Sequence, residues 1–164
     1  MDIRSNNKGW KVAPKIGNRY LALIFRLYIG GLFIYASIYK INYAGEFAET
    51  IASYQLVPFW AVNVLALVMP WTELFCGLLL VAGIRTRSVA TMIAAMLGLF
   101  TLALAINLLR GAPIVCGCFR ATDDPIGWTT LVRDLAWLAM TVYVYFFDSA
   151  WQLEKLFLIP LEEV

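Results

Sequence analysis

The chain has 164 residues, of which 62% are hydrophobic and only 15% are charged, and it contains no histidine. This composition is typical of an integral membrane protein rather than of a soluble domain. The missing histidine excludes haem ligation by histidine, a serine–histidine hydrolase and most zinc sites, and the net charge of +2 is too small and dispersed for a nucleic-acid partner.

Four stretches are long and apolar enough to cross a hydrocarbon core of about 30 Å as helices, which takes roughly 20 residues. They cover residues 20–39, 58–84, 89–109 and 126–147. We therefore predict an all-α membrane protein whose single membrane domain, residues 20–147, is a bundle of four transmembrane helices. Residues 1–19 are expected to form a basic tail and residues 148–164 an interfacial tail.

The first apolar stretch follows a basic leader, as a signal peptide would. It is long, carries Arg26 and continues into Lys40 without a convincing small-residue cleavage site. We therefore interpret it as a retained transmembrane helix.

Lysine and arginine are unevenly distributed over the connections, and this bias predicts the orientation. One side carries eight basic residues: Arg4, Lys8, Lys11, Lys15, Arg19, Arg85, Arg87 and Lys155. The other side carries three: Lys40, Arg110 and Arg120. Both termini are therefore expected in the cytoplasm of a bacterium, in a multi-pass protein of the inner membrane, with residues 40–57 and 110–125 on the periplasmic side.

The first outer connection, residues 40–57, contains a regular apolar pattern. Phe47, Ile51 and Tyr54 recur at intervals of three and four residues, which is the spacing of one helix face. We predict a short amphipathic helix that lies at the membrane interface and ends before Pro58. This helix is expected to lie near the second outer connection.

Ionisable residues within the spans cost on the order of 3 kcal/mol each and usually have partners. A rise of about 1.5 Å per residue places Arg26 and Glu73 at matching depths, so we predict an ion pair between them, or a protonated and hydrogen-bonded Glu73 if the two helices are rotated apart. Asp134 is predicted to face inward and pair with Lys40 at the outer end of the first span. Arg133 projects about 100° away from Asp134 and is expected to lean toward the second outer connection or a lipid head group. An ion-pair frame that fixes packing and a proton relay are both open interpretations.

The second outer connection includes GAPIVCGCFRATDD, residues 111–124, in which Cys116 and Cys118 are separated by Gly117. On the periplasmic side such a pair can cycle between dithiol and disulfide. Gly117 permits the turn needed to close this short ring, and a disulfide closed this way is strained and easily reduced. Arg110 and Arg120 add positive potential, which favours the nucleophilic thiolate.

Three alternatives to redox chemistry apply to the loop thiols. A metal site needs more ligands than two thiolates, and the chain adds only Cys76 and carboxylates, so no metal site is predicted. A purely structural disulfide would close almost no loop and would stabilise little. Inert thiols that behave as small hydrophobic side chains remain open. Cys76 itself lies near the cytoplasmic end of the second span and is interpreted as a packed apolar side chain.

Several residues in this framework resemble one family of membrane proteins. They are Lys40, residues 54–58, PWTEL (70–74), Gly77, Gly83, RG (110–111), CGCF (116–119) and RD (133–134). Over roughly residues 20–147 the chain resembles the DoxX-like proteins, specifically their MauE branch. The family pattern continues CGCFG, whereas this chain has Arg120 at the last position.

The resemblance implies a redox-associated protein of the bacterial inner membrane. The MauE branch is similar in outline to four-helix disulfide oxidoreductases of the DsbB and vitamin K epoxide reductase type, and is linked to maturation of periplasmic proteins with a thioredoxin-like partner. We therefore expect thiol–disulfide exchange at Cys116 and Cys118, with Gly117, Phe119, Arg110 and Arg120 in support. Cys118, nearer Arg120, is favoured as the attacking thiol.

The exchange itself requires no cofactor. A quinone held near Trp60, Phe119 and Trp128 is a candidate electron acceptor, although aromatic residues at these depths more often form an interface belt. The alternative function is a noncatalytic membrane anchor or assembly subunit of a respiratory or periplasmic complex. Redox competence of the cysteine pair distinguishes the two functions.

Overall fold

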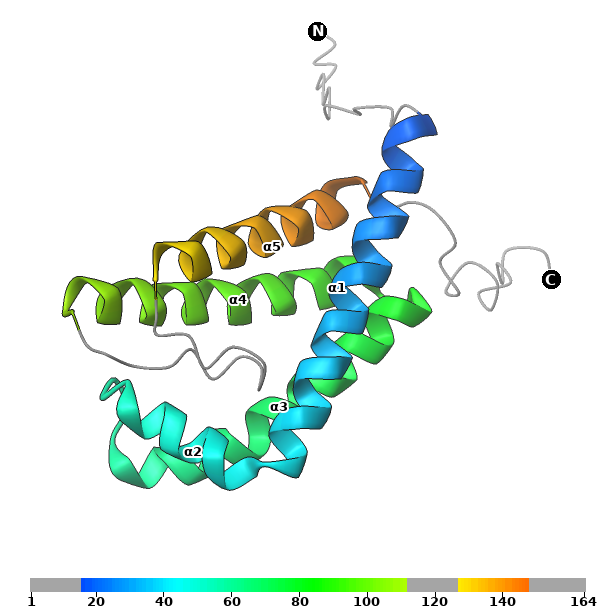
Figure 1. The fold of residues 1–164 in the computed structure, drawn as a ribbon. Helices are drawn as coiled ribbons and strands as arrows, with labels where there is room; N and C mark the ends of the chain where they lie inside the picture. The colour runs from blue at the N-terminus through cyan, green and yellow to red at the C-terminus, as the bar shows by residue number, and fades with distance from the viewer. Residues whose placement is uncertain (1–15, 112–126, 148–164) are drawn as a thin grey trace, which may run out of the picture.

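The computed structural model describes residues 16–111 and 127–147. All regular structure in these ranges is helical, as Figure 1 shows: α1 (Ile16–Asn42), α2 (Ala44–Ser53), α3 (Phe59–Ala82), α4 (Thr86–Leu109) and α5 (Trp128–Phe147). Four of them, α1, α3, α4 and α5, are long and apolar enough to cross a membrane. The predicted all-α fold with four membrane helices and a short helix in the first connection is confirmed.

Proline and glycine mark the ends of the helices where the chain must turn. Pro58 is the N-cap of α3. N–H groups at the start of a helix have no partner within it, so the N–H that proline lacks costs no hydrogen bond at this position. Gly83 ends α3 with a left-handed φ of 74° and donates its N–H to the carbonyls of Leu79 and Leu80. Gly111 follows α4 with a φ of 65° and turns the chain toward the second connection.

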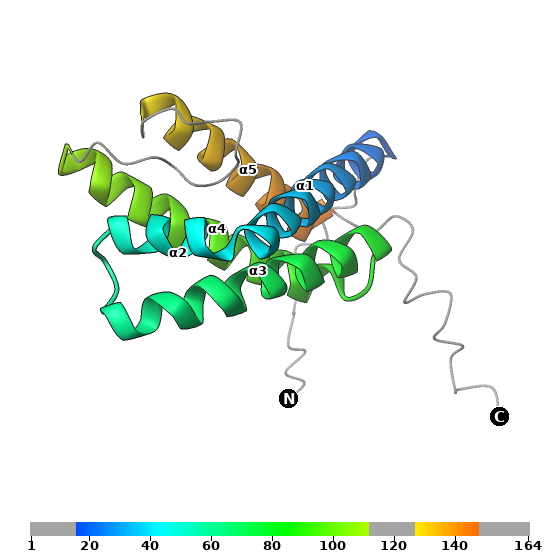
Figure 2. The same cartoon turned by 60° about the horizontal axis from the view of Figure 1, so that its bottom comes forward.

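The bundle is built from two well-packed helix pairs, α1 with α3 and α4 with α5, which are joined by contacts of α1 with α5 and of α3 with α4. Figures 1 and 2 show α1 crossing α3, with α4 and α5 side by side. A core of buried apolar side chains, including Ile29, Leu80, Ile93 and Val144, lies where the pairs meet. This packing leaves one face of every long helix outside the core.

The outward faces of the long helices are apolar. Large exposed side chains include Ile24 on α1, Leu67 on α3, Leu99 on α4 and Phe146 on α5. A soluble monomer does not expose apolar patches on all sides, because they drive association in water. The surface therefore matches a hydrocarbon environment, and the chain is a multi-pass membrane protein.

The connections of an up-and-down bundle alternate between its two ends. The α1–α3 connection, which contains α2, and the α4–α5 connection therefore lie at the same end, which we call the α2 end (Figure 1). The α3–α4 connection with Arg85, the start of α1 and the end of α5 lie at the opposite end. The last residue of α4 and the first residue of α5 thus lie at the same end of the bundle as α2.

Helices α1 and α3 approach each other closely at two glycines. A Cβ atom placed on Gly77 would lie 2.9 Å from the carbonyl oxygen of Gly30 and 2.9 Å from Cγ1 of Ile34. Helices in a membrane pack closely where small residues let their backbones meet. A Cβ on the neighbouring Gly31 would meet nothing within 4 Å.

The substitution Gly77→Ala is expected to destabilise the bundle by about 1–3 kcal/mol, because backbone atoms must move to admit the methyl group. Gly31→Ala is the matched control. It gains the same helix propensity in open space and is expected to be neutral or stabilising by up to about 1 kcal/mol. Thermal unfolding of the purified protein in detergent measures both, and equal effects of the two variants would contradict the close contact.

Candidate functional site

The predicted redox residues fall largely outside the described part of the chain. Cys116, Gly117, Cys118, Phe119 and Arg120 lie outside the described residues. Their flanks are described: α4 ends at the α2 end with an exposed Arg110, and α5 begins there with Trp128. The described part of the site at this end consists of side chains of α1, α2, α3, α4 and α5.

A buried ion pair joins α1 to α3 near the α2 end. The Nζ atom of Lys40 donates to both carboxylate oxygens of Glu73, at 2.7 and 2.8 Å, and both side chains are buried. Lys40 also lies 4.9 Å from the ring centroid of Phe47 on α2. A cation over an aromatic face is attracted by the ring quadrupole, so Lys40 ties all three helices together.

The predicted Arg26–Glu73 pair is wrong, because Glu73 pairs with Lys40 instead. The Gly30–Gly77 contact sets the register: Glu73 and Lys40 lie on the α2 side of this contact, whereas Arg26 lies on the other side. Helical side chains tilt toward the N-terminus of their own helix. In antiparallel α1 and α3 this tilt turns Lys40 and Glu73 toward each other and turns Arg26, which is buried elsewhere on α1, away from Glu73.

Asp134 faces inward, as predicted, but its predicted ion pair with Lys40 is not formed, since the ammonium group is bound by Glu73. The side chain of Asp134 is fully buried at 0% exposure, and within residues 16–111 and 127–147 neither of its oxygens has a hydrogen-bond partner. Nε of Arg133 lies 3.6 Å from Oδ1, beyond hydrogen-bond reach, and the guanidinium stacks 4.8 Å from the centroid of Trp137. A buried carboxylate without a hydrogen bond is costly, so Asp134 stands out among the polar groups of the bundle.

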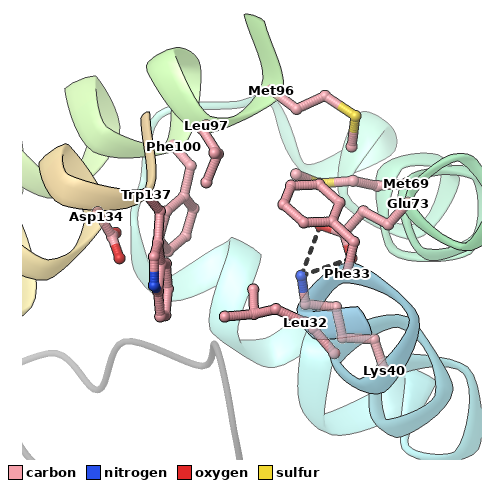
Figure 3. Close-up of a pocket in the computed structure, with 11 residues that line it drawn as sticks. Leu32, Phe33, Lys40, Met69, Glu73, Met96, Leu97, Phe100, Asp134 and Trp137 are labelled. Atoms are coloured by element: carbon pink, nitrogen blue, oxygen red, sulfur yellow. Dashed lines mark hydrogen bonds and ion pairs between the residues drawn. The ribbon is translucent and has the colours of Figure 1, made fainter. Parts of the chain in front are cut away.

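These polar groups line one cavity inside the bundle, shown in Figure 3. Asp134 and Trp137 of α5 lie on one side of it, and Lys40 and Glu73 lie on the other. The remaining walls are apolar, and the cavity volume is about 50 Å³. Small-molecule sites typically combine apolar walls with a few polar groups in this way.

A second cavity adjoins the first and shares Lys40, Met69 and Phe100 as walls. It lies under α2, is lined mostly by apolar side chains, among them Phe47 and Tyr54, and has a volume of about 170 Å³. Burial, and secondarily the negative charge of Asp134, raise the pKa of the Tyr54 phenol, so this hydroxyl stays neutral. The predicted face of α2 therefore roofs an apolar space: Phe47 is buried within α2, and the buried Tyr54 follows its last residue.

Sequence inspection missed the apolar walls of the first cavity, although helical spacing contained the signal. Each polar wall residue has an apolar partner three or four residues away: Ala36 before Lys40, Met69 before Glu73, and Trp137 after Asp134. Residues at such spacing share one helix face. Looking three and four residues away from each buried charged residue finds these positions. It does not reveal which helix faces contact each other.

Two other sequence predictions concern described residues. Cys76 is a free thiol in the hydrophobic core, packed in one cluster with Ile29 and Leu80, which agrees with its interpretation as an apolar side chain. Trp60 and Trp128 are 78% and 68% exposed at the α2 end. Such exposed indoles fit an interface belt, and neither lines the two cavities.

The model of the family described as methylamine utilisation protein MauE matches residues 18–147. The chain belongs to the MauE family. Methylamine utilization protein MauE of Paracoccus denitrificans is 34% identical over 121 residues, which cover 73% of this chain and 65% of the relative. The MauE proteins of Methylophilus methylotrophus and Methylorubrum extorquens are 35% and 32% identical over 76% and 72% of this chain, and 67% and 62% of their own lengths are matched.

The match to these relatives thus spans about two thirds of their length. No solved structure gives a significant match to the chain. MauE-family membership and the four apolar helices agree in describing a membrane protein.

Removing one partner of the Lys40–Glu73 pair leaves a buried charge without compensation. Lys40→Met and Glu73→Gln are each expected to destabilise the protein by about 3–5 kcal/mol, and the double variant by clearly less than the sum. Unfolding in graded denaturing detergent, analysed as a double-mutant cycle, measures the coupling.

Arg26→Met combined with Glu73→Gln provides the matched control for this cycle. Arg26 is buried like Lys40 but lies on the other side of the Gly30–Gly77 contact, so its effect and that of Glu73 are expected to add within about 0.5 kcal/mol. If the effects of Lys40 and Glu73 were additive and those of Arg26 and Glu73 were coupled, Arg26 and not Lys40 would be the partner of Glu73.

Proposed function

We propose that this MauE-family protein is an inner-membrane redox protein that exchanges disulfides with a thioredoxin-like periplasmic partner through Cys116 and Cys118. The relatives are called methylamine utilization proteins, and we extend that role to this chain, as support for the maturation of a periplasmic enzyme of the same system. Its grouping with DoxX-like proteins is part of the proposal. The observation that carries it is topological: α4 ends and α5 begins at the α2 end, and the sequence between them contains C-G-C.

The α2 end differs chemically from the opposite end. It carries the Lys40–Glu73 pair, the carboxylate of Asp134 and two adjoining cavities, whereas the buried groups described toward the opposite end are the apolar core around Ile29 and Leu80 and the side chain of Arg26. The exposed Arg110 at the end of α4 adds positive charge where the connection that contains C-G-C begins. A cationic neighbourhood favours the thiolate form of a cysteine, which supports the proposal.

The proposed exchange begins with both loop cysteines reduced. One loop thiolate attacks the partner's disulfide, a mixed disulfide forms, and one partner sulfur leaves as a thiolate. The second loop thiolate then attacks the mixed disulfide, so that Cys116 and Cys118 end as a disulfide and the partner ends as a dithiol. Two electrons pass from this chain to the partner.

The same exchange in the opposite direction leaves Cys116 and Cys118 reduced and the partner oxidised. We propose that a membrane quinone then accepts two electrons and two protons from the two thiols, which yields a hydroquinone and restores the loop disulfide. This step returns the chain to its starting state and makes it an oxidant for the partner.

The reduction potential of the Cys116–Cys118 pair tests the proposed function. In a Cys76→Ser background only the loop thiols react, and alkylation across a graded glutathione series with mass spectrometry follows their oxidation. We expect a reversible two-electron transition between about −270 and −120 mV, the range of thioredoxin-like oxidoreductases. Cys116→Ser is expected to abolish the transition and to trap a mixed disulfide at Cys118. A pair that forms no disulfide at any potential would favour the noncatalytic anchor or assembly subunit.

The orientation of the chain is tested by a membrane-impermeant maleimide. In intact spheroplasts of Cys76→Ser protein, the reduced loop thiols are expected to react, because the α2 end faces the periplasm. The matched control places the sole cysteine at the opposite end, as Arg85→Cys with Cys116→Ser and Cys118→Ser, and is expected to react only after permeabilisation. The reverse labelling pattern would place the thiols in the cytoplasm and contradict periplasmic exchange.

A further inference from the structure

The cavity between α1, α3, α4 and α5 contains a polar group that the described residues leave unsatisfied. The Asp134 carboxylate is fully buried, and none of these residues donates a hydrogen bond to either oxygen. The two Lys40 bonds on the other side of the cavity both go to Glu73, so that pair is satisfied internally. The cavity therefore offers a buried hydrogen-bond acceptor to whatever occupies it.

The charges around the cavity already cancel in pairs, which determines the charge of the ligand. Lys40 compensates Glu73 directly, and Arg133 compensates Asp134 at 3.6 Å without a hydrogen bond. A cationic or anionic ligand would add a net charge to a membrane-buried space, which is expensive. A neutral ligand with a hydroxyl donor satisfies Asp134 and leaves the balance unchanged.

The walls favour a flat, apolar ring. Phe33, Phe100 and Trp137 present three aromatic side chains, and Met69 and Met96 present two thioethers (Figure 3). Aromatic rings pack edge-to-face or offset against other rings, and thioether sulfurs make favourable contacts with ring edges. The chemistry of these walls therefore matches the faces and edges of a single substituted ring.

The second cavity provides an apolar extension toward the lipid. It joins the first at Lys40, Met69 and Phe100, and one of its walls is Leu99, which is 70% exposed on the outer face of α4. Because that face lies against hydrocarbon, a hydrophobic substituent on the ring can extend through this space into the bilayer. The ligand is therefore expected to be lipid-soluble.

We propose that this cavity binds a neutral, lipid-soluble hydroquinone or related phenol, whose ring packs against Trp137 and Phe100 and whose hydroxyl donates a hydrogen bond to Asp134. The inference rests on the proposed function and gives a binding site to the hydroquinone that the proposed quinone step produces. It places the ring inside the bundle, between the Lys40–Glu73 pair and Asp134, and not beside the exposed Trp60 and Trp128.

The test compares two ligands on the purified full-length protein in lipid nanodiscs, without oxygen. Tetramethylhydroquinone carries two hydroxyl donors, and its dimethyl ether has the same ring without a donor. Calorimetric titration is expected to show at least tenfold tighter binding of the hydroquinone. Equal affinities, or binding of neither compound, would overturn the assignment.

Two isosteric variants on α5 locate the hydrogen bond. Asp134→Asn replaces the charged acceptor by a weaker neutral one and is expected to lower hydroquinone affinity about tenfold, with ether affinity unchanged. Thr141→Val is the matched control, since Thr141 is buried on the same helix and bonds only the carbonyl of Trp137. An equal loss in both variants would overturn the role of Asp134.

Two further variants test the location of the site and separate ligand binding from the redox activity of the cysteines. Ala36→Leu is expected to fill the cavity and abolish binding of both ligands, which tests the location if Asp134→Asn does not fold. Cys116→Ser with Cys118→Ser is expected to bind tetramethylhydroquinone like the unmodified chain. If this double variant binds the hydroquinone but Cys116 and Cys118 of the unmodified chain form no disulfide, the binding site stands and the thiol–disulfide exchange is rejected. If the cysteine pair is redox-active but the protein does not bind the hydroquinone, only the binding site is rejected.

Discussion

The buried bond between Lys40 and Glu73 is the interaction on which the α2 end of the bundle depends. It joins α1 to α3, holds the ammonium group beneath Phe47 of α2, and forms one side of the first cavity and part of the second. Two charges at this depth persist only because each satisfies the other in a close bidentate contact. The pair therefore connects helix packing with the shape of the space beside it.

Close backbone packing sets the register that makes this pair. Gly30 and Gly77 let α1 and α3 meet, and the antiparallel direction of the helices then turns Lys40 and Glu73 toward each other. Arg26 lies on the far side of the same contact and leans the other way. Matching depth alone is thus a poor predictor of partners, because it ignores the tilt of helical side chains.

Asp134 shows the opposite arrangement, a buried charge that the bundle compensates without a hydrogen bond. Arg133 folds over Trp137 one turn away and supplies the balancing charge at 3.6 Å. The described part of the chain offers these carboxylate oxygens no hydrogen-bond donor at the wall of the aromatic cavity. Buried polar groups without hydrogen bonds are rare in stable proteins and are found at functional sites. This carboxylate, rather than the Lys40–Glu73 pair, therefore indicates a ligand.

The amino-acid sequence by itself determined the membrane class, the four helices and the short helix of the first connection, because long apolar runs and residues at three- and four-residue spacing have few other structural solutions. It also predicted that Asp134 faces inward. Only the tertiary structure decided that Glu73 binds Lys40 and that Ala36, Met69 and Trp137 share a cavity with Asp134. The physical reason is that periodicity gives the face of one helix, whereas partners depend on the crossing point, direction and register of two helices, which here are set by the contact of Gly30 with Gly77.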